Sequence, residues 1–323
     1  MKKVLITGAG GMVGSHMVET LSSAGGYKII GTYYKPTTIL SEFDPNIEMI
    51  ECDVRYQEHV DKIISDFMPD EIYHLAAQSY PTVSWDRPYE TIDTNVKGTV
   101  AVFEAVKRLK KNNHRYDPVV VVACSSAEYG ETLNELQGDG IYVKETAELK
   151  PLHPYGVSKV AQDLLSFQYF MNDGIHSIRA RIFNSTGTRK VNDVTSDFTK
   201  RAVESVKNKT YKIKVGNLST RRAIMDQRDL VNALLLLAEK GKAGDVYNIS
   251  SEYIYLMSDI VHMIENVIQH KLETYVDKTL LRSTDEKVIA GDVTKLKQDT
   301  GWKQKIPMEQ TIKDMIQYWE KHD

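Results

Sequence analysis

The chain has 323 residues, 41% hydrophobic and 26% charged, which is typical of a soluble globular protein with one large domain or two of ordinary size. Its formal net charge of -3 excludes a general attraction to nucleic acid or to an anionic membrane surface. No apolar run approaches the ~18 residues that a bilayer span needs. The N-terminus lacks the pattern of a signal peptide, so we expect a cytoplasmic protein.

Short apolar runs alternate with amphipathic segments through the first half of the chain. We expect strands at residues 4–7, 28–32, 47–52, 71–75, 118–126 and 177–183, and helices at residues 13–23, 57–67, 89–110 and 154–172. The run PVVVVACSS at 118–126 has the continuous β-branched character of a parallel strand buried on both faces. The alternation predicts parallel β-α-β units and therefore a doubly wound, Rossmann-like α/β sheet.

The regular alternation weakens after residue 184. Further helices are expected at residues 196–207, 229–240 and 308–321, and further strands at 211–215 and 245–249. We expect residues 1–185 to form a dinucleotide-binding domain, to which the chain returns at about 222–250. Residues 186–323 would then form mainly a smaller α/β substrate-binding part. No linker rich in proline or glycine separates the two parts, so we expect them to share one cleft.

The stretch TGAGGMVG at residues 7–14 joins the first predicted strand to the first predicted helix. Its glycines follow the spacing GxxGxxG at Gly8, Gly11 and Gly14. Glycines let the backbone turn tightly and approach a diphosphate, and the helix N-terminus offers free N–H groups to that anion. The stretch therefore predicts a dinucleotide site. The further cofactor-binding positions that we expect are Met12, Val13, Leu75, Ala76, Ala77 and Gln78.

The end of the second strand usually selects the cofactor. A carboxylate there holds the ribose hydroxyl of NAD, whereas a basic side chain accepts the extra phosphate of NADP. Here the sequence is GTYYK, and Lys35 is its only charge. This favours NADP(H), while NAD(H) stays possible because Lys35 could equally be a solvated loop residue. Asp53 and Val54, after the third strand, are expected to meet the adenine.

Tyr155 and Lys159 are four residues apart at the start of a predicted helix, so they share one face. A nearby ammonium is expected to lower the pKa of the Tyr155 phenol from its usual ~10 and so to allow proton exchange near neutral pH. Lys159 could also bond a nicotinamide ribose. Ser125, at the end of a neighbouring strand, would hold the substrate oxygen beside Tyr155, and Asn95 lies in another predicted helix.

No metal site is expected. The nine histidines form no HxxxH pattern and no cluster with cysteine. His74 ends a predicted strand, where a structural role is the simpler interpretation.

Motifs of one family extend over nearly the whole chain. They are TGAGGMVG, CDV at 52–54, HLAAQS at 74–79, DTNVKGT at 93–99, CSSAEYG at 124–130, PYGVSK at 154–159, RIFNSTG at 181–187, VGNLSTRRAIMDQRD at 215–229, GDVYNIS at 244–250 and GWKQKIP at 301–307. The chain thereby resembles the extended short-chain dehydrogenase/reductase family, in its nucleotide-sugar branch. The nearest groups are the GDP-4-keto-6-deoxymannose reductases and the GDP-mannose 4,6-dehydratases.

The resemblance implies a catalytic trio of Ser125, Tyr155 and Lys159, supported by Asn95, and a nucleoside-diphosphate sugar as substrate. A GDP-sugar is expected on the resemblance alone. It also implies a homodimer, or a dimer of dimers, formed through the helices near 89–110 and 154–172. The substrate-binding residues that we expect are Ser79, Ser126, Ala127, Asn184, Arg222 and Arg282. Around Arg282 the sequence RSTD departs from the family's RPxE/D element, because Ser283 replaces the proline.

Two reactions remain in competition. Residues 74–88 resemble the dehydratases, whereas residues 211–248 resemble the reductases. In the dehydratase pattern a glutamate lies two residues before the tyrosine of the Tyr-Gly pair, a position held here by Ala127. Glu128 is one residue before Tyr129, and it would point away from the substrate if the backbone stays extended.

This departure favours NAD(P)H-dependent redox chemistry at C4 over water elimination. A 4,6-dehydratase in which a local shift brings Glu128 into use stays open as an alternative. So does a nucleotide-sugar 4-dehydrogenase or epimerase.

Overall fold

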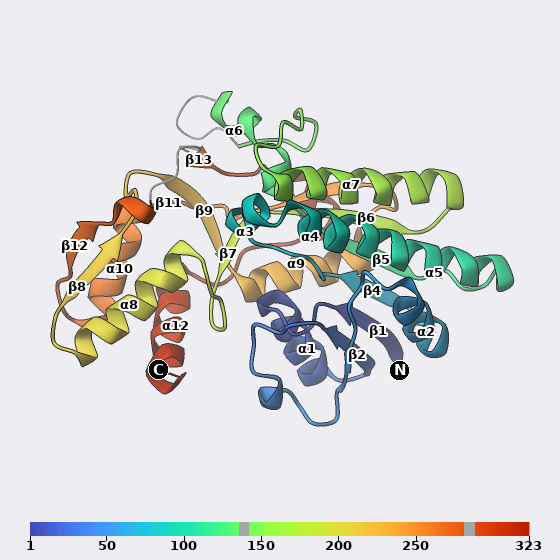
Figure 1. Ribbon diagram of the computed structural model, residues 1–323, viewed down its shortest axis with the longest axis horizontal. Coiled ribbons are helices and arrows are strands. Elements are labelled where there is room, and N and C mark those ends of the chain that lie inside the picture. Colours follow the sequence, from blue (N-terminus) through green and yellow to red (C-terminus); the bar gives the residue numbers. More distant parts are fainter. Residues whose placement is uncertain (136–141, 281–287, 323) are drawn as a thin grey trace.

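The computed structural model describes residues 1–135, 142–280 and 288–322. Its largest feature is a seven-stranded parallel sheet in the order β10-β6-β5-β4-β1-β2-β3 (Figure 1). The strands are β1 (Lys2–Thr7), β2 (Tyr27–Tyr33), β3 (Glu48–Glu51), β4 (Glu71–His74), β5 (Val119–Ser125), β6 (Ser177–Ile182) and β10 (Val246–Ile249). This confirms the predicted doubly wound, Rossmann-like sheet. The strand order reverses between β1 and β4, where such sheets open a crevice at the carboxyl ends of their strands.

Helices cover both faces of this sheet (Figure 1). On one face lie α2 (Gln57–Phe67), α5 (Gly98–Asn112) and α7 (Pro154–Asp173), and on the other lie α1 (Met12–Ala24), α9 (Gln227–Lys240) and α11 (Thr294–Thr300). Val4 and Ile6 of β1 pack into the core under α1 and α9, whereas Leu5 packs into the core under α2 and α5. This alternation is why the strands read as continuous apolar runs. Among the described helices, none combines the length and the apolar character that crossing a membrane would require.

A smaller α/β part lies beyond the carboxyl ends of the strands. It contains a second sheet, with β9 (Arg221–Asp226) between β11 (Ile254–Leu256) and β13 (Val288–Ile289), and with β7 (Asn184–Thr186) also paired to β9. β8 (Lys212–Val215) pairs with β12 (Glu273–Val276). Helices α8 (Val194–Lys207), α10 (Met257–Ile268) and α12 (Met308–His322) enclose a separate apolar core.

The helix expected at 89–110 consists of three consecutive segments. These are α4 (Pro88–Ile92), a π-helical turn at Asp93–Lys97 and α5. The short helices α3 (Pro81–Asp86) and α6 (Glu131–Glu135) were not expected. π-turns inside α-helices are frequent at functional sites, and this one carries Asn95.

Candidate active site

A cavity of about 1090 Å³ lies between the large sheet and the smaller α/β part. It is lined by all of the expected cofactor-binding residues, Gly8, Gly11, Met12, Val13, Gly14, Lys35, Asp53, Val54, Leu75, Ala76, Ala77, Gln78, Tyr155 and Lys159. It is also lined by Ser79, Ser125, Ser126, Ala127, Asn184 and Arg222. Arg282 lies outside the described residues. One cavity therefore brings together residues that are more than two hundred positions apart in the chain.

The glycine turn forms a narrow backbone cradle at one end of the cavity. Gly8 has a φ of +72°, and a Cβ there would lie 2.7 Å from the backbone nitrogen of Ala76. A Cβ on Gly14 would lie 2.5 Å from the backbone oxygen of Gly8, whereas one on Gly11 would meet only that oxygen, at 3.3 Å. Helix α1 then begins without a side-chain cap. The first-turn N–H groups and the close backbone approach at these glycines fit a dinucleotide diphosphate.

Two cations lie at the end of β2 and β3. Lys35 Nζ is 5.1 Å from the centroid of the Tyr34 ring, and the guanidinium carbon of Arg55 is 5.6 Å from the same centroid. Arg55 is held there by Asp53, with Nε to Oδ1 at 2.9 Å. Sequence reasoning missed Arg55, although its position two residues after Asp53 was a usable signal. Lys35 is among the residues that line the cavity, whereas Arg55 is not, and its charge is paired with Asp53.

Ser125, Tyr155 and Lys159 meet at the carboxyl end of β5. Ser125 is the last residue of that strand, and its side chain is hydrogen-bonded to Tyr155. Helix α7 begins at Pro154, where the Nδ1 atom of His153 caps it by accepting the N–H of Gly156 at 3.0 Å. Tyr155 and Lys159 therefore lie in its first two turns, on the face toward the sheet.

The electrostatics of this group differ from our expectation. Burial raises the pKa of Tyr155 to about 12, although the hydrogen bond with Ser125 lowers it. The expected lowering of the Tyr155 pKa by Lys159 is therefore wrong. Lys159 Nζ donates to the backbone oxygen of Ala123 at 2.7 Å and lies 5.7 Å from the centroid of the Tyr155 ring. Burial lowers the pKa of Lys159 itself to about 8.

Asn95 is buried next to the site but is not among the residues that line the cavity. Its Oδ1 accepts the N–H of Gln78 at 2.8 Å, and its Nδ2 donates to the backbone oxygen of Gln78 at 3.1 Å and to Ser158 Oγ at 2.8 Å. Asn95 thus ties the loop after β4, which lines the cavity, to helix α7.

Glu128 is turned away from the cavity. Residues 126–128 form a short 3-10 turn, so the backbone does not stay extended there. Glu128 nevertheless lies in the core, fully buried, where it accepts the N–H of Ser125 at 2.8 Å and lies 3.2 Å from Arg181 Nε. Glu128 is therefore a structural carboxylate and does not face solvent. Ala127, in contrast, lines the cavity.

The arginines after residue 184 separate into two groups. Arg222, on β9, lines the cavity together with Arg189 and Lys190. Arg228 instead makes ion pairs with Asp226 and Asp314, each at 2.7 Å. Arg201 was missed by sequence reasoning because it lies within an amphipathic helix, and it also lines the cavity.

His74 is a buried structural residue. Its ring nitrogens are 2.9 Å from Thr7 Oγ1 and 3.2 Å from Thr99 Oγ1, and burial lowers its pKa to about 3.

Comparisons with known proteins find one family that matches nearly the whole chain. A family model described as GDP-mannose 4,6 dehydratase matches residues 5–315. The GDP-6-deoxy-D-mannose reductase of Pseudomonas aeruginosa is 24% identical over 99% of this chain and 97% of its own length. GDP-mannose 4,6 dehydratase 1 of Arabidopsis thaliana is 26% identical over 98% of this chain and 89% of its own length.

Solved structures share the fold. RMD from Pseudomonas aeruginosa complexed with NADPH is 23% identical and superimposes with a TM-score of 0.84 over 100% of both chains. The UDP-glucose 4-epimerase of Thermotoga maritima with UDP-glucose is 23% identical, with a TM-score of 0.88 over 99% of both chains. At these identities the likeness extends to the fold alone.

Proposed function

The chain belongs to the GDP-mannose 4,6-dehydratase family, whose members are NAD(P)-dependent nucleotide-sugar enzymes of the short-chain dehydrogenase/reductase type, and on this premise we propose that it reduces a 4-keto sugar. The substrate that we propose is a GDP-linked 4-keto-6-deoxyhexose, and the cofactor is NADPH. One observation carries this choice of reaction. The position at which the dehydratase pattern has its glutamate is Ala127, and the neighbouring carboxylate of Glu128 is buried in the core against Arg181.

A dehydratase must remove the proton at C5 and expel the C6 hydroxyl as water, and a carboxylate beside the sugar does this work. A reductase needs neither step. In the proposed reaction the bound cofactor supplies the hydride for C4. Ser125 holds the C4 oxygen, and Tyr155 donates its phenolic proton to that oxygen. The raised pKa of Tyr155, about 12, suits this direction because the phenol stays protonated at neutral pH.

NADP(H) is favoured over NAD(H) by the cations at the end of β2. Lys35 and Arg55 both lie near the Tyr34 ring, and β2 ends without a carboxylate. Guanidinium and ammonium groups suit a ribose phosphate, whereas a carboxylate would repel it. The similar structure of RMD from Pseudomonas aeruginosa, which is complexed with NADPH, supports the same choice.

The dehydratase reaction is the second candidate, and it is favoured by the name of the matching family and by the plant relative. For this chain it requires Glu128 to leave its buried ion pair and enter the cavity. That rearrangement would take the Glu128 carboxylate from Arg181 and leave the buried N–H of Ser125 without its acceptor, which is costly.

One incubation separates the two reactions. Purified protein receives GDP-mannose, and half of the sample also receives a GDP-mannose dehydratase and NADPH. The absorbance of reduced nicotinamide and the mass of the sugar nucleotide are followed. NADPH consumption with a 6-deoxy product in the supplemented half alone supports the reductase. Loss of water from GDP-mannose in the other half would overturn it in favour of the dehydratase.

A further inference from the structure

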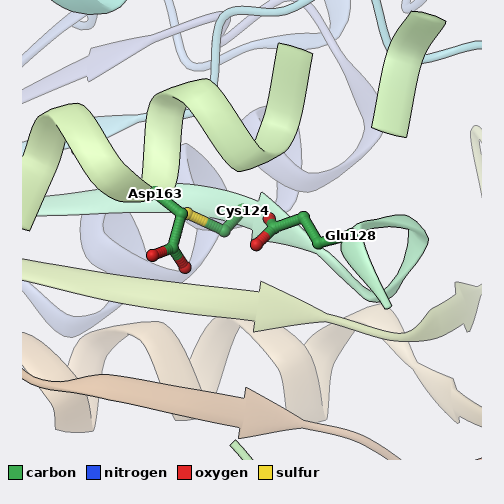
Figure 2. Close-up of side chains that lie close together, drawn as sticks. All are labelled: Cys124, Glu128 and Asp163. Carbon is green, nitrogen blue, oxygen red and sulfur yellow. The ribbon is translucent and has the colours of Figure 1, made fainter. Parts of the chain in front are cut away.

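Glu128 is a fully buried carboxylate that the proposed chemistry does not use. Figure 2 shows it with Cys124 and Asp163 in the layer between helix α7 and the sheet. A carboxylate is costly to bury unless it is paired and hydrogen-bonded. The groups that it contacts therefore indicate what it does.

On one side Glu128 holds Ser125. Its Oε1 accepts the backbone N–H of Ser125 at 2.8 Å, and the Oγ of Ser125 accepts the N–H of Ala127 at 3.2 Å. Together these bonds form a reciprocal capping box around the turn that follows β5. They restrain both the backbone and the side chain of the residue that hydrogen-bonds Tyr155.

On the other side Glu128 is linked to helix α7. Arg181, on β6, lies with its Nε 3.2 Å from Oε2 of Glu128 and 2.9 Å from Oδ2 of Asp163. Asp163 belongs to α7, four residues after Lys159 and eight after Tyr155, so the three share one face. Arg179 holds the other oxygen of Asp163 at 2.7 Å.

We propose that Glu128 is a positioning residue of the active site. It holds the backbone of Ser125 in place, and it links Ser125 through Arg181 and Asp163 to helix α7. That helix carries Tyr155 and Lys159. The effect of Glu128 on turnover rests on the proposed function, whereas its effect on Ser125 does not. The three atoms of Cys124, Glu128 and Asp163 that could bind a metal lie within 4.8 Å of one another. Arg181 already supplies the positive charge there, so we propose no ion.

The charge of Glu128 also affects the pKa values of Tyr155 and Lys159. The titratable and charged side chains that face it are Asp163, Lys159 and Tyr155 from α7, Arg181 from β6, Cys124 from β5, and the adjoining Tyr129. Burial and Asp163 raise the pKa of Glu128 to about 8, against the opposing effects of Arg181, the Ser125 N–H and Lys159. Burial lowers the pKa of Lys159 into the same range, to about 8. An ionised Glu128 favours the Lys159 ammonium.

Three variants test this assignment. Glu128→Gln keeps an oxygen that can accept the Ser125 N–H but removes the charge, whereas Glu128→Ala removes both. Glu145→Gln is the matched control. Glu145 accepts the Asn248 N–H at 2.9 Å and its backbone oxygen accepts from Arg181 at 3.0 Å, so it borders the same network without touching Ser125.

The first readout needs no substrate. Amide hydrogen exchange of the peptide that contains Ser125 is measured by mass spectrometry. Exchange at Ser125 should rise roughly tenfold or more in Glu128→Ala, because its N–H loses a buried acceptor. Glu128→Gln and Glu145→Gln should resemble the wild type. If Glu128→Ala exchanges like the wild type, or if Glu128→Gln exchanges freely, the positioning role is wrong, whatever the enzyme reduces.

The second readout is the pH profile of NADPH-dependent reduction. We expect Glu128→Ala to lose roughly 10- to 100-fold in kcat, since a small misplacement of a catalytic group has that effect. Glu128→Gln should recover most of this rate at pH 7 but move the alkaline limb of the profile to lower pH by roughly one unit. An unchanged limb in Glu128→Gln, or a shift that Glu145→Gln shares, would overturn the proposal. A wild type that reduces no sugar defeats the proposed function, and hydrogen exchange then decides on Glu128 alone.

Discussion

Lys159 lies one helical turn after Tyr155 on α7, but its ammonium donates to the backbone oxygen of Ala123 at 2.7 Å rather than to the phenol. The ammonium is 5.7 Å from the centroid of the tyrosine ring. Burial therefore governs both groups, and it raises the pKa of Tyr155 to about 12 and lowers that of Lys159 to about 8. At neutral pH the pair consists of a protonated phenol and a cation that is near its own titration.

This arrangement predicts the pH dependence of reduction. Tyr155 keeps its proton throughout the neutral range, so the rate should be level from about pH 6 to about pH 7.5 and should fall above about pH 8 as Lys159 loses its charge. Lys159→Met should reduce kcat by roughly 10²-fold or more and abolish the fall in rate above pH 8. The measurement is kcat against pH. If kcat still falls above pH 8 in Lys159→Met, a group other than Lys159 causes the fall.

The raised pKa of Glu128 predicts a change in stability with pH. Its pKa of about 8 in the folded protein exceeds the ordinary glutamate value of 4.5, so Glu128 contributes stability that is present below about pH 4.5 and is lost as the pH rises toward 8. Glu128→Gln lacks this loss. The Tm of the wild type should therefore fall relative to that of Glu128→Gln between pH 5.5 and pH 9, by differential scanning fluorimetry. Parallel curves would show that Glu128 is already ionised at the lower pH.

The glycine turn predicts a contrast between two glycines with similar, positive φ angles. Gly8 has φ +72° and Gly25 has φ +68°, but an added Cβ meets the backbone of Ala76 at Gly8 and nothing within 4 Å at Gly25. Gly25→Ala should cost about 1 kcal/mol of stability through backbone strain and leave dinucleotide binding intact. Gly8→Ala should abolish that binding as well, measured by nicotinamide fluorescence. Equal effects of the two changes on binding would contradict the assignment of the glycine turn as the dinucleotide site.

The choice of cofactor can be tested at Lys35. Lys35→Ala should weaken NADPH binding roughly tenfold and leave NADH binding unchanged, because only NADPH carries the extra phosphate. Lys28→Ala is a matched control, since Lys28 lies at the other end of β2 with its ammonium 5.8 Å from the Phe67 ring, much as Lys35 lies 5.1 Å from Tyr34. The measurement is the Kd of each dinucleotide. Equal losses for NADPH and NADH would assign Lys35 a role unrelated to the phosphate.

The features that could be predicted from the sequence are those that depend on residues close together in the chain. The glycine turn, Ser125 at its strand end and the pair Tyr155 and Lys159 depend on neighbours within a few residues, and the structure brings them to one cavity. The pKa of Tyr155 could not be predicted, because burial is produced by packing against distant segments. The position of Glu128 depends on Arg181, which is 53 residues away in the chain.

The strands of the smaller α/β part were harder to predict because they also depend on residues far apart in the chain. β9 begins with the polar pair Arg221 and Arg222, and it is a strand because it pairs with β7, β11 and β13 from three separate regions of the chain. Local composition does not reveal such pairing. The π-turn around Asn95 was likewise hidden, since its residues also suit an ordinary α-helix.

Exposed apolar side chains on α7 predict self-association. Leu164 is 53% exposed and Met171 60% exposed, with Phe167 between them on the same stripe, and the exposed Trp85 and Tyr89 lie on the adjoining helices α3 and α4. Such contiguous apolar surface is typical of an interface. We expect a homodimer that buries this stripe against its own copy. Light scattering after gel filtration should therefore give twice the chain mass of 36.7 kDa.

Leu164→Arg with Met171→Arg should convert the dimer to a folded monomer, because two cations would have to be buried against their own copies in a twofold contact. Val276→Arg is the matched control, since Val276 is also 60% exposed but lies on β12 in the smaller part. It should leave the mass unchanged. A wild type that is monomeric at micromolar concentration, or a double variant that remains a dimer, would place the interface elsewhere or remove it.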